Sequence, residues 1–190
     1  KPGSAFRDLV QGETDRDVSV FETNIRVLGG LLAAHDLSGD ADVLELAESI
    51  AARLSAAFDT PSGVPHSFVN VKTGNSFGLP WTKGASILAD FGSMHLEWAT
   101  LSARTKNPVY EAHTNHVFET VSSLGRRGKS GASTKGLFSA HFNVDTGEFA
   151  GGDVTFGALG DSFYEYLIKC WRSLGDLKDA ETWREMFDEA

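Results

Sequence analysis

Apolar residues recur three and four positions apart along most of the chain, which is the spacing of an amphipathic helix. One face of residues 42–58, for example, carries Val43, Leu46, Ile50 and Leu54. The periodicity predicts helices that come in consecutive pairs, and Pro and Gly residues mark several of their ends. The predicted helices span residues 18–35, 42–58, 83–105, 108–124, 161–174 and 178–190.

Between the helix pairs the pattern changes to that of short strands. Residues 64–77 are predicted to form a hairpin that turns at 72–75, and residues 137–149 a second hairpin that turns at 143–147. The order is therefore two helices, a β-excursion, two helices, a β-excursion and two helices. This order predicts an all-α fold of consecutive αα-hairpins, which stack into a solenoid or close into a toroid.

Composition narrows the class of protein. The chain has 190 residues, of which 41% are hydrophobic, so it can bury the core of one domain. Its formal charge of -9 argues against a nucleic-acid partner, because binding to phosphates needs a basic surface. No apolar run approaches the roughly 20 residues that span a bilayer. The one cysteine, Cys170, excludes an internal disulfide and is expected in the core.

The first candidate for chemistry is a carboxylate and a guanidinium in the apolar helix 18–35. Glu22 and Arg26 are four residues apart and share a helix face. Their apolar neighbours leave little polar surface around them, and a charge in such a place is costly unless it is paired or useful. The pattern by itself fits a structural buried ion pair at least as well as an active site.

Two further carboxylates stand among apolar residues and glycines. Asp90 lies within the predicted helix 83–105, with Glu97 seven residues later on the same face. Asp161 stands at the start of the helix 161–174, where an aspartate also serves as an N-cap. Semi-buried acids with aromatic residues nearby are typical of a glycosidase, which needs one protonated and one ionised carboxyl group across the sugar.

At this point the chain resembles the class I α-1,2-mannosidases, glycoside hydrolase family 47. The resemblance rests on five ordered blocks with family-like spacing, from S-V-F-E-T-N-I-R at the first to G-A-L-G-D-S-F-Y-E-Y at the last; they stand at residues 19–40, 56–70, 81–98, 142–149 and 157–171. Members of that family fold as an (α/α)7 barrel and remove terminal α-1,2-linked mannose from N-glycans with inversion. The resemblance therefore implies an inverting mannosidase whose substrate is a high-mannose N-glycan.

The resemblance also implies roles for particular residues. Glu22 matches the general acid and Arg26 the arginine one turn further along the helix. Asp161 matches one of two candidates for the base or water-orienting residue. Ser67 and Asp90 match positions of the substrate cleft, although the family usually has Glu where this chain has Asp90, so the reach is one methylene shorter.

Subgroup and location are implied in the same way. Leu159 matches a position at which arginine is typical of endoplasmic-reticulum members and leucine of Golgi members. The chain is thus expected to belong to the Golgi-like subgroup, which trims several mannoses. Both groups work in the lumen of the secretory pathway, in the Golgi or the endoplasmic reticulum.

Length is the main departure from the family, whose catalytic domains are more than twice as long. Residues 1–190 are expected to form one partial catalytic domain, the middle of the barrel, with about six of its fourteen helices. The family binds one Ca²⁺, but its protein ligand, a C-terminal threonine, would lie outside this chain. Within the chain no metal site is predicted: His113 and His116 are three residues apart but read as a solvated helix face.

Three hypotheses follow. The first is a catalytic-domain segment, with the remainder of the barrel either supplied as another chain or absent in a truncated relative. The second is a mannose- or N-glycan-binding relative that keeps the pocket but has no turnover. The third is a helical scaffold, which predicts that Glu22 and Arg26 are paired deep in the packing with no cleft beside them.

Overall fold

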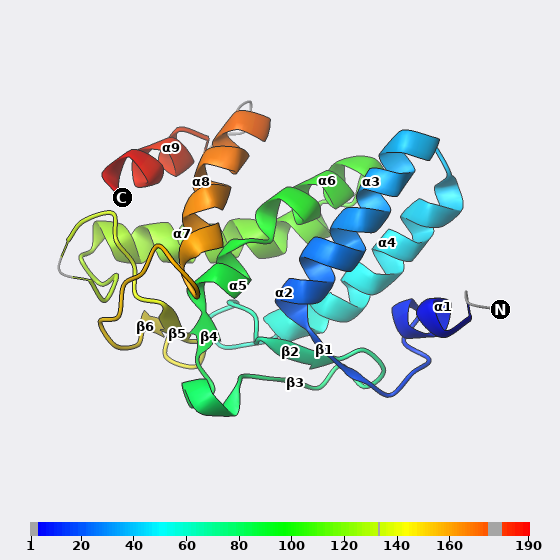
Figure 1. The fold of residues 1–190 in the computed structure, drawn as a ribbon, viewed down its shortest axis with the longest axis horizontal. Coiled ribbons are helices and arrows are strands. Elements are labelled where there is room, and N and C mark those ends of the chain that lie inside the picture. The colour runs from blue at the N-terminus through cyan, green and yellow to red at the C-terminus, as the bar shows by residue number, and fades with distance from the viewer. Residues whose placement is uncertain (1–3, 133, 175–179) are drawn as a thin grey trace.

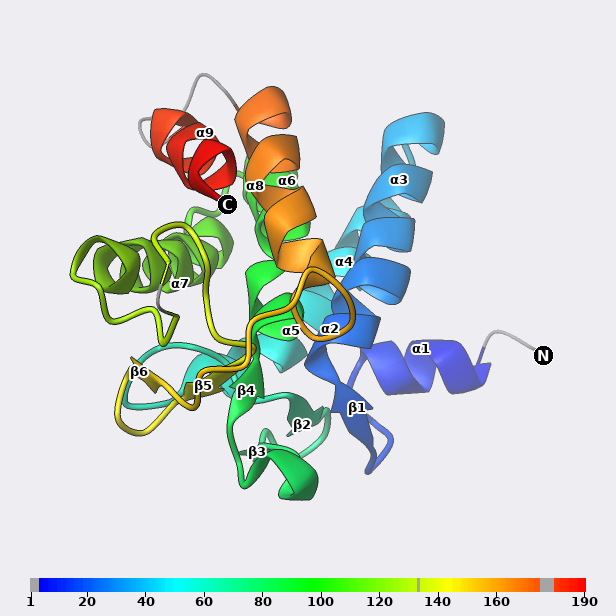
Figure 2. The same cartoon turned by 60° about the vertical axis from the view of Figure 1, so that its left-hand side comes forward.

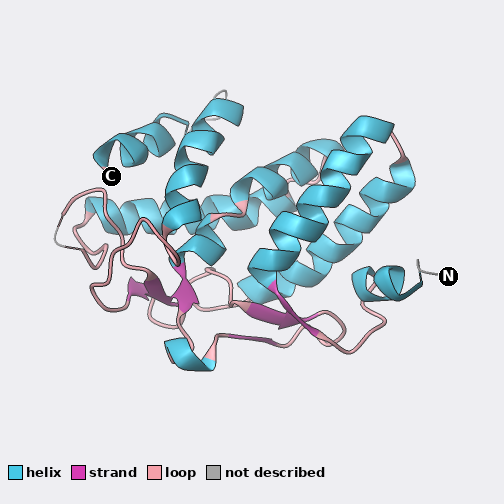
Figure 3. Cartoon of the chain, in the orientation of Figure 1, coloured by secondary structure: helices cyan, strands magenta, loops and turns pink. Residues whose placement is uncertain are grey.

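The computed structural model describes residues 4–132, 134–174 and 180–190. Its helices lie on one side of the molecule and two small sheets run along the opposite edge (Figures 1 and 3). The predicted class, all-α with short β-excursions, is confirmed. The largest interfaces between helices are those of three antiparallel pairs: α3 with α4, α6 with α7, and α8 with α9. The bounds of these helices are given below.

The first long helix is continuous but not uniform. It consists of α2 (Val20–Glu22), a π-helical turn (Thr23–Leu28) and α3 (Gly29–Ser38). It begins two residues later than predicted, because strand β1 (Asp17–Ser19) occupies the preceding positions. The helix ends where Gly39 adopts a left-handed conformation with φ 71°.

The remaining elements include helix α1 and strand β4, which were not predicted. The helices are α1 (Ser4–Val10), α4 (Ala41–Leu54), α5 (Leu88–Gly92), α6 (His95–Thr105), α7 (Val109–Arg126), α8 (Asp161–Ser173) and α9 (Ala180–Glu189). The strands are β2 (Phe68–Asn70), β3 (Ser76–Phe77), β4 (Ser86–Ile87), β5 (His141–Asn143) and β6 (Glu148–Phe149). The predicted start of the last helix, at residue 178, lies outside the described residues.

Both predicted hairpins are present, and each gains a third strand from an earlier segment. β2 and β3 pair antiparallel, and β1 joins them with Ser19 opposite Phe68. β5 and β6 pair in the same way, and β4 joins them with Ile87 opposite His141. In each sheet the added strand leads directly into a helix, β1 into α2 and β4 into α5, so the sheets fix where those helices begin.

The single helix predicted over residues 83–105 is wrong. Lys83 and Gly84 have φ of 55° and 86°, which excludes a right-handed helix there, and β4 follows. The helical run that starts at Leu88 is then broken at Ser93, whose φ of -118° and ψ of 48° are not helical. The apolar period continues across this break, which is why the periodicity did not reveal it.

The core lies between the helices and on the side of the sheets that faces the helices. Its largest fully buried side chains include Trp98, Phe142, Leu28, Ile50 and Leu54. Trp98 packs edge-on against Phe58 with ring centroids 4.9 Å apart, and Cys170 is buried as expected. No helix among the described residues is long and apolar enough to cross a membrane.

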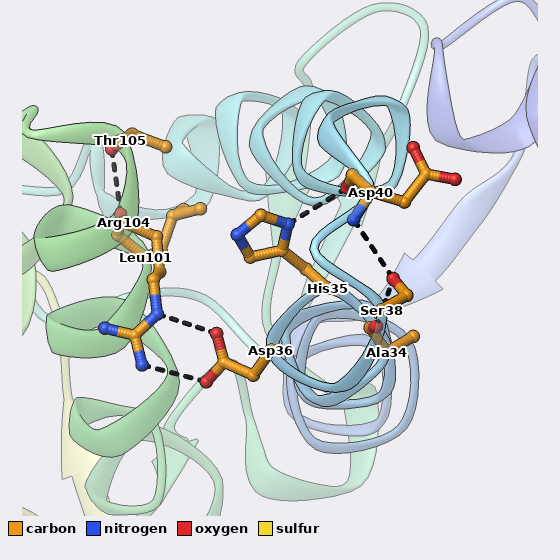
Figure 4. A network of polar contacts seen from close by, with 8 residues as sticks. All are labelled: Ala34, His35, Asp36, Ser38, Asp40, Leu101, Arg104 and Thr105. Carbon is orange, nitrogen blue, oxygen red and sulfur yellow. Dashed lines mark hydrogen bonds and ion pairs between the residues drawn. The ribbon is translucent and has the colours of Figure 1, made fainter.

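At the end of α3 that is remote from the sheets, an ion pair joins this helix to α6. Arg104 donates to both carboxylate oxygens of Asp36, at 2.7 and 2.9 Å (Figure 4). The hydrogen bond from Arg104 holds the pKa of Asp36 below its ordinary value. Beside this pair, Nδ1 of His35 lies 2.9 Å from the carbonyl oxygen of Asp40, which closes the turn between α3 and α4.

Candidate active site

Three helices begin side by side at the end of the molecule that carries the sheets. Figures 1 and 2 show the first turns of α2, α5 and α8 next to one another above the strands. α5 contacts both of the other helices in this cluster. Each helix carries one of the predicted carboxylates in its first turn: Glu22 in α2, Asp90 in α5 and Asp161 in α8.

Backbone hydrogen bonds connect the segments that carry these carboxylates. The N–H of Val20, at the start of α2, donates to the carbonyl oxygen of Ser67 at 2.9 Å. The hydroxyl of Ser86, in β4, donates to the carbonyl oxygen of Pro65 at 2.7 Å. The loop 65–67 therefore joins the start of the helix that bears Glu22 to the strand that leads to Asp90.

Similar bonds join the α5 segment to α8. The N–H of Ala89 donates to the carbonyl oxygen of Leu159 at 2.9 Å, and the hydroxyl of Ser162 donates to that of Ala89 at 3.4 Å. Ala89 and Asp90 are neighbours in sequence, as are Asp161 and Ser162. The structure thus brings the segments of Glu22, Ser67, Asp90, Leu159 and Asp161 together.

Glu22 and Arg26 form the predicted ion pair, through Nε of Arg26 and Oε2 of Glu22. The expectation of a buried pair is wrong, since the side chains are 49% and 70% exposed. The apolar residues around them on the helix cover other faces: Val20 and Leu28 point into the core, whereas Glu22 and Arg26 point outward. An exposed ion pair contributes little to stability. The Glu22–Arg26 pair is therefore not needed to stabilise the fold.

Asp90 is partly buried at the start of α5. Burial, and secondarily the negative charge of Glu22, raise the pKa of Asp90 to about 6 from 3.8. Asp90 lines a small pocket with Ser67, His66 and Phe21. The hydroxyl of Ser67 is buried there and has no hydrogen-bond partner among the described residues. A buried polar atom without a partner at a pocket wall is suited to bind a polar ligand.

Asp161 is exposed and is the first residue of α8, after the N-cap residue Gly160. Its Oδ1 accepts the N–H of Ser162 at 2.9 Å. The carboxylate therefore sits beside the free amides of a helix N-terminus, where negative charge is favoured. The alternative role of N-cap, which the sequence left open, belongs to Gly160.

Leu159 has a left-handed backbone, with φ 79°. Such a conformation costs a residue with a Cβ about 1–2 kcal/mol, and strain of this kind gathers at functional sites. Here it lets the Leu159 carbonyl reach Ala89 just before the chain turns into α8.

Two features near the site were missed by the sequence interpretation. The first is a polar network that joins the buried Asn24 to the half-buried Glu97 and Tyr166, in which Asn24 donates to Glu97 at 3.2 Å and Tyr166 donates to it at 3.0 Å. The signal available was an asparagine within an otherwise apolar helical run. The second is Trp81, which is 60% exposed beside His141, the residue opposite Ile87 of β4.

The histidines and carboxylates of the described residues are not clustered as metal ligands. Among the described residues there is no group of three or more His, Cys, Asp or Glu side chains placed to hold a metal ion. His116 instead lies 3.0 Å from the Ser62 carbonyl oxygen, and His113 stacks on Phe58 at 4.7 Å. The part of the chain that the structure describes therefore does not form a calcium site by itself.

Comparison with known proteins shows one family. The model of glycosyl hydrolase family 47 matches residues 5–190. The chain is 43% identical over 175 residues to mannosyl-oligosaccharide alpha-1,2-mannosidase IA of Drosophila melanogaster, covering 92% of this chain and 25% of that protein. It is 40% identical over 179 residues to mannosyl-oligosaccharide 1,2-alpha-mannosidase MNS1 of Arabidopsis thaliana, covering 94% of this chain and 31% of that protein.

Structural comparison agrees. The alpha-1,2-mannosidase from Trichoderma reesei matches with a TM-score of 0.79 and 29% sequence identity, covering 97% of this chain and 40% of that chain. The chain thus spans less than half of the length of each of these relatives.

Proposed function

The chain belongs to glycosyl hydrolase family 47, and from this we propose that it is part of an inverting α-1,2-mannosidase that removes terminal mannose from high-mannose N-glycans. The relatives it matches are named mannosyl-oligosaccharide 1,2-alpha-mannosidases. The observation that supports the proposal most is the grouping of Glu22, Asp90 and Asp161 at the adjoining N-terminal turns of three helices.

In the proposed mechanism, Glu22 is the general acid that protonates the leaving oxygen. Arg26 pairs with the Glu22 carboxylate that remains after this proton transfer, and keeps the side chain directed to the outer face of the helix. Asp161 orients or deprotonates the attacking water, and the amide of Ser162 supports its negative charge. Inverting glycosidases need two such carboxyl groups on opposite sides of the sugar, with room for a water between one of them and the anomeric carbon.

Asp90 and Ser67 form the proposed pocket for the terminal mannose. The hydroxyl of Ser67 has no hydrogen-bond partner among the described residues and would pair with a sugar hydroxyl once the pocket opens to admit it. Asp90, whose pKa is raised to about 6, can act as an acceptor when ionised and as a donor when protonated. Leu159 at the edge of α8 is proposed to give the broad, Golgi-like trimming pattern.

The chain spans less than half of the length of the relatives it matches. We propose that the remainder of the barrel, in the same or another polypeptide, covers Glu22 and supplies the ligand for Ca²⁺. When bound, that ion would support sugar binding at the base of the barrel. The proposed location is the lumen of the secretory pathway, where N-glycans are processed.

One observation favours the second candidate, a glycan-binding relative without turnover. Ser67 and Asp90 line a pocket that this chain forms alone, whereas Glu22 stands half exposed in water. A general acid acts best where water is excluded, so binding can exist without hydrolysis.

A chimera separates the two functions. Residues 5–190 would replace the matching segment of the Trichoderma reesei enzyme, and mannose release and glycan binding would be measured with and without Ca²⁺. Release that depends on Glu22 supports the mannosidase, whereas binding without release supports the second candidate. A folded chimera that neither binds nor releases mannose would contradict both.

A further inference from the structure

Asn24 is a fully buried polar side chain two residues after Glu22, within the π-helical turn. Its Nδ2 donates to the carbonyl oxygen of Ser93 at 3.1 Å and to Oε2 of Glu97 at 3.2 Å. Its Oδ1 accepts the indole N–H of Trp98 at 2.9 Å. Because the indole can only donate, it fixes which end of the amide is the oxygen, and both amide hydrogens then point at acceptors.

The first acceptor lies at the break between α5 and α6. Ser93 is the non-helical residue that follows α5, three residues after Asp90. A carbonyl oxygen at such a break has lost its partner in the helix and must find another donor. Asn24 is that donor, so the side chain connects the turn after Glu22 to the end of the short helix that carries Asp90.

The second acceptor extends the connection to α8. Glu97 also accepts the hydroxyl of Tyr166, at 3.0 Å for Oε1 and 3.2 Å for Oε2. Tyr166 lies in α8, five residues after Asp161. The burial of Glu97 raises its pKa, and the bonds from Tyr166 and Asn24 oppose this rise by favouring the charged form. The network therefore holds one half-buried carboxylate between the π-helical turn and α8, and Asn24 connects it to the break after α5.

From this geometry we propose that Asn24 is a positioning residue, which sets the placement of Glu22 relative to Asp90 by joining the π-helical turn to the break at Ser93. The catalytic meaning of this placement rests on the proposed function, but the placement itself does not. Asn24 is buried in the protein and is not a group that contacts the sugar. Its bonds are short-range and directional, unlike the apolar contacts around it, and they connect positions close to both carboxylates.

A readout that does not need activity is the titration of Asp90. In the intact chain Asp90 is shielded from water and lies near the charge of Glu22. Those two causes also define the direction of change: if the segments move apart, water reaches Asp90 and the charge of Glu22 is more distant, so Asp90 ionises at lower pH. Carboxyl ¹³C NMR of the folded protein measures this midpoint directly.

The test compares Asn24→Ala with Tyr110→Phe. Tyr110 donates from its hydroxyl to Glu48 at 3.1 Å and joins α7 to α4, outside the candidate site. Asn24→Ala should lower the Asp90 midpoint by at least about half a pH unit, while Tyr110→Phe leaves it unchanged. Asn24→Ser keeps one hydroxyl donor in the same cavity and serves if the alanine variant does not fold; it should shift the midpoint in the same direction by less.

A folded Asn24 variant with the wild-type Asp90 midpoint would overturn the proposal, and so would an equal shift in Tyr110→Phe. The chimera adds a kinetic readout, in which a positioning role predicts that Asn24→Ser lowers kcat about tenfold or more with little change in KM. If the midpoint shifts but the parent chimera releases no mannose, the positioning role stands and the proposed function fails. If the chimera is active and Asn24→Ser changes neither the Asp90 midpoint nor kcat, the proposed function stands and the positioning role of Asn24 fails.

Discussion

Ala89 donates its backbone N–H to the carbonyl oxygen of Leu159 at 2.9 Å, one residue before Asp90 and two residues before Asp161. The bond connects α5 and α8 through main-chain atoms directly beside the two carboxylates. Main-chain bonds of this kind do not depend on side-chain rotamers, so they hold the two helix starts in a defined relation. The hydrogen bond from Ala89 holds Leu159 in its left-handed backbone conformation, although this conformation costs free energy.

Glu22→Gln in the chimera should reduce mannose release by about 10²- to 10⁴-fold, because the amide cannot donate a proton to the leaving oxygen. Glycan affinity should change little, since the amide is nearly isosteric and still forms hydrogen bonds. The measurement is kcat and KM on an α-1,2-linked mannose oligosaccharide, after a thermal melt shows that the variant is folded. Near wild-type turnover would show that Glu22 is not the acid. The turnover of Asp90→Asn should then be measured as well, because Asp90 also holds a proton in weakly acidic solution.

Asp90→Asn should stabilise the fold above pH 6. A carboxyl group whose pKa is raised from 3.8 to about 6 on folding takes up a proton in the native state. Its stability contribution is fully present below pH 3.8 and is lost as the pH rises through 6, whereas asparagine does not titrate. The gain of the variant should therefore grow between pH 4 and pH 7 to on the order of 2–3 kcal/mol.

Urea unfolding at a series of pH values measures this gain. Asp153→Asn is the control, because Asp153 is exposed, and its effect should not follow the same pH curve. A pH-independent gain in Asp90→Asn would show that Asp90 is not desolvated as the structure has it.

Gly160→Ala should destabilise the chain by about 1–3 kcal/mol. A Cβ at this position would lie 2.2 Å from the carbonyl oxygen of Thr155, so the loop before α8 must move. Gly30→Ala is the matched control: its Cβ would meet nothing within 4 Å, and removing a helical glycine should stabilise by about 0.5–1 kcal/mol. Thermal unfolding of both variants gives the two signs, and equal effects would contradict the packing described at Gly160.

Trp81→Ala should weaken glycan binding with little change in stability. The indole is 60% exposed and lies beside the sheet that leads into α5, where its face can pack on a sugar ring. Calorimetric titration of the chimera with a high-mannose glycan should show a several-fold loss of affinity, since a sugar-stacking contact is worth about 1 kcal/mol. Phe6→Ala is the control: Phe6 is also an exposed aromatic residue but lies in α1, and its removal should leave the affinity unchanged.

The sequence allowed the helix pairs and both hairpins to be predicted, because their apolar periods are regular and their turns contain Gly, Pro, Asn and Asp. The break at Ser93 could not be predicted in this way, since Phe91, Met94 and Trp98 keep a helical apolar period across it. The local apolar pattern gives no information about the donor that satisfies the Ser93 carbonyl oxygen, because this donor, Asn24, is 69 residues away.

The candidate site was predicted in part. Resemblance to the family suggested Glu22, Asp90 and Asp161 as site residues; the fold places their segments together, and their roles stay a prediction. Local sequence gave the wrong exposure for Glu22 and Arg26, because a helix with apolar residues on three sides was taken to be covered on the fourth. Exposure depends on which elements pack against a face, and a pattern within one helix does not contain that information.

The π-helical turn between Glu22 and Gly29 has a consequence for insertions and deletions. In this turn the N–H of Gly29 bonds to the carbonyl oxygen of Asn24, five residues earlier, so the turn holds one residue more than an α-helical turn would. An α-helical turn in its place would need one residue fewer, so deleting one residue other than Asn24 from this turn would restore regular helix with α2 and α3 close to their present orientations. Deleting a residue between Gly29 and Leu32, in the regular helix α3, would instead rotate the preceding segment by about 100° relative to Leu32 and turn Glu22 away from Asp90. The π-helical turn therefore tolerates a change of residue count that the regular helix after it does not.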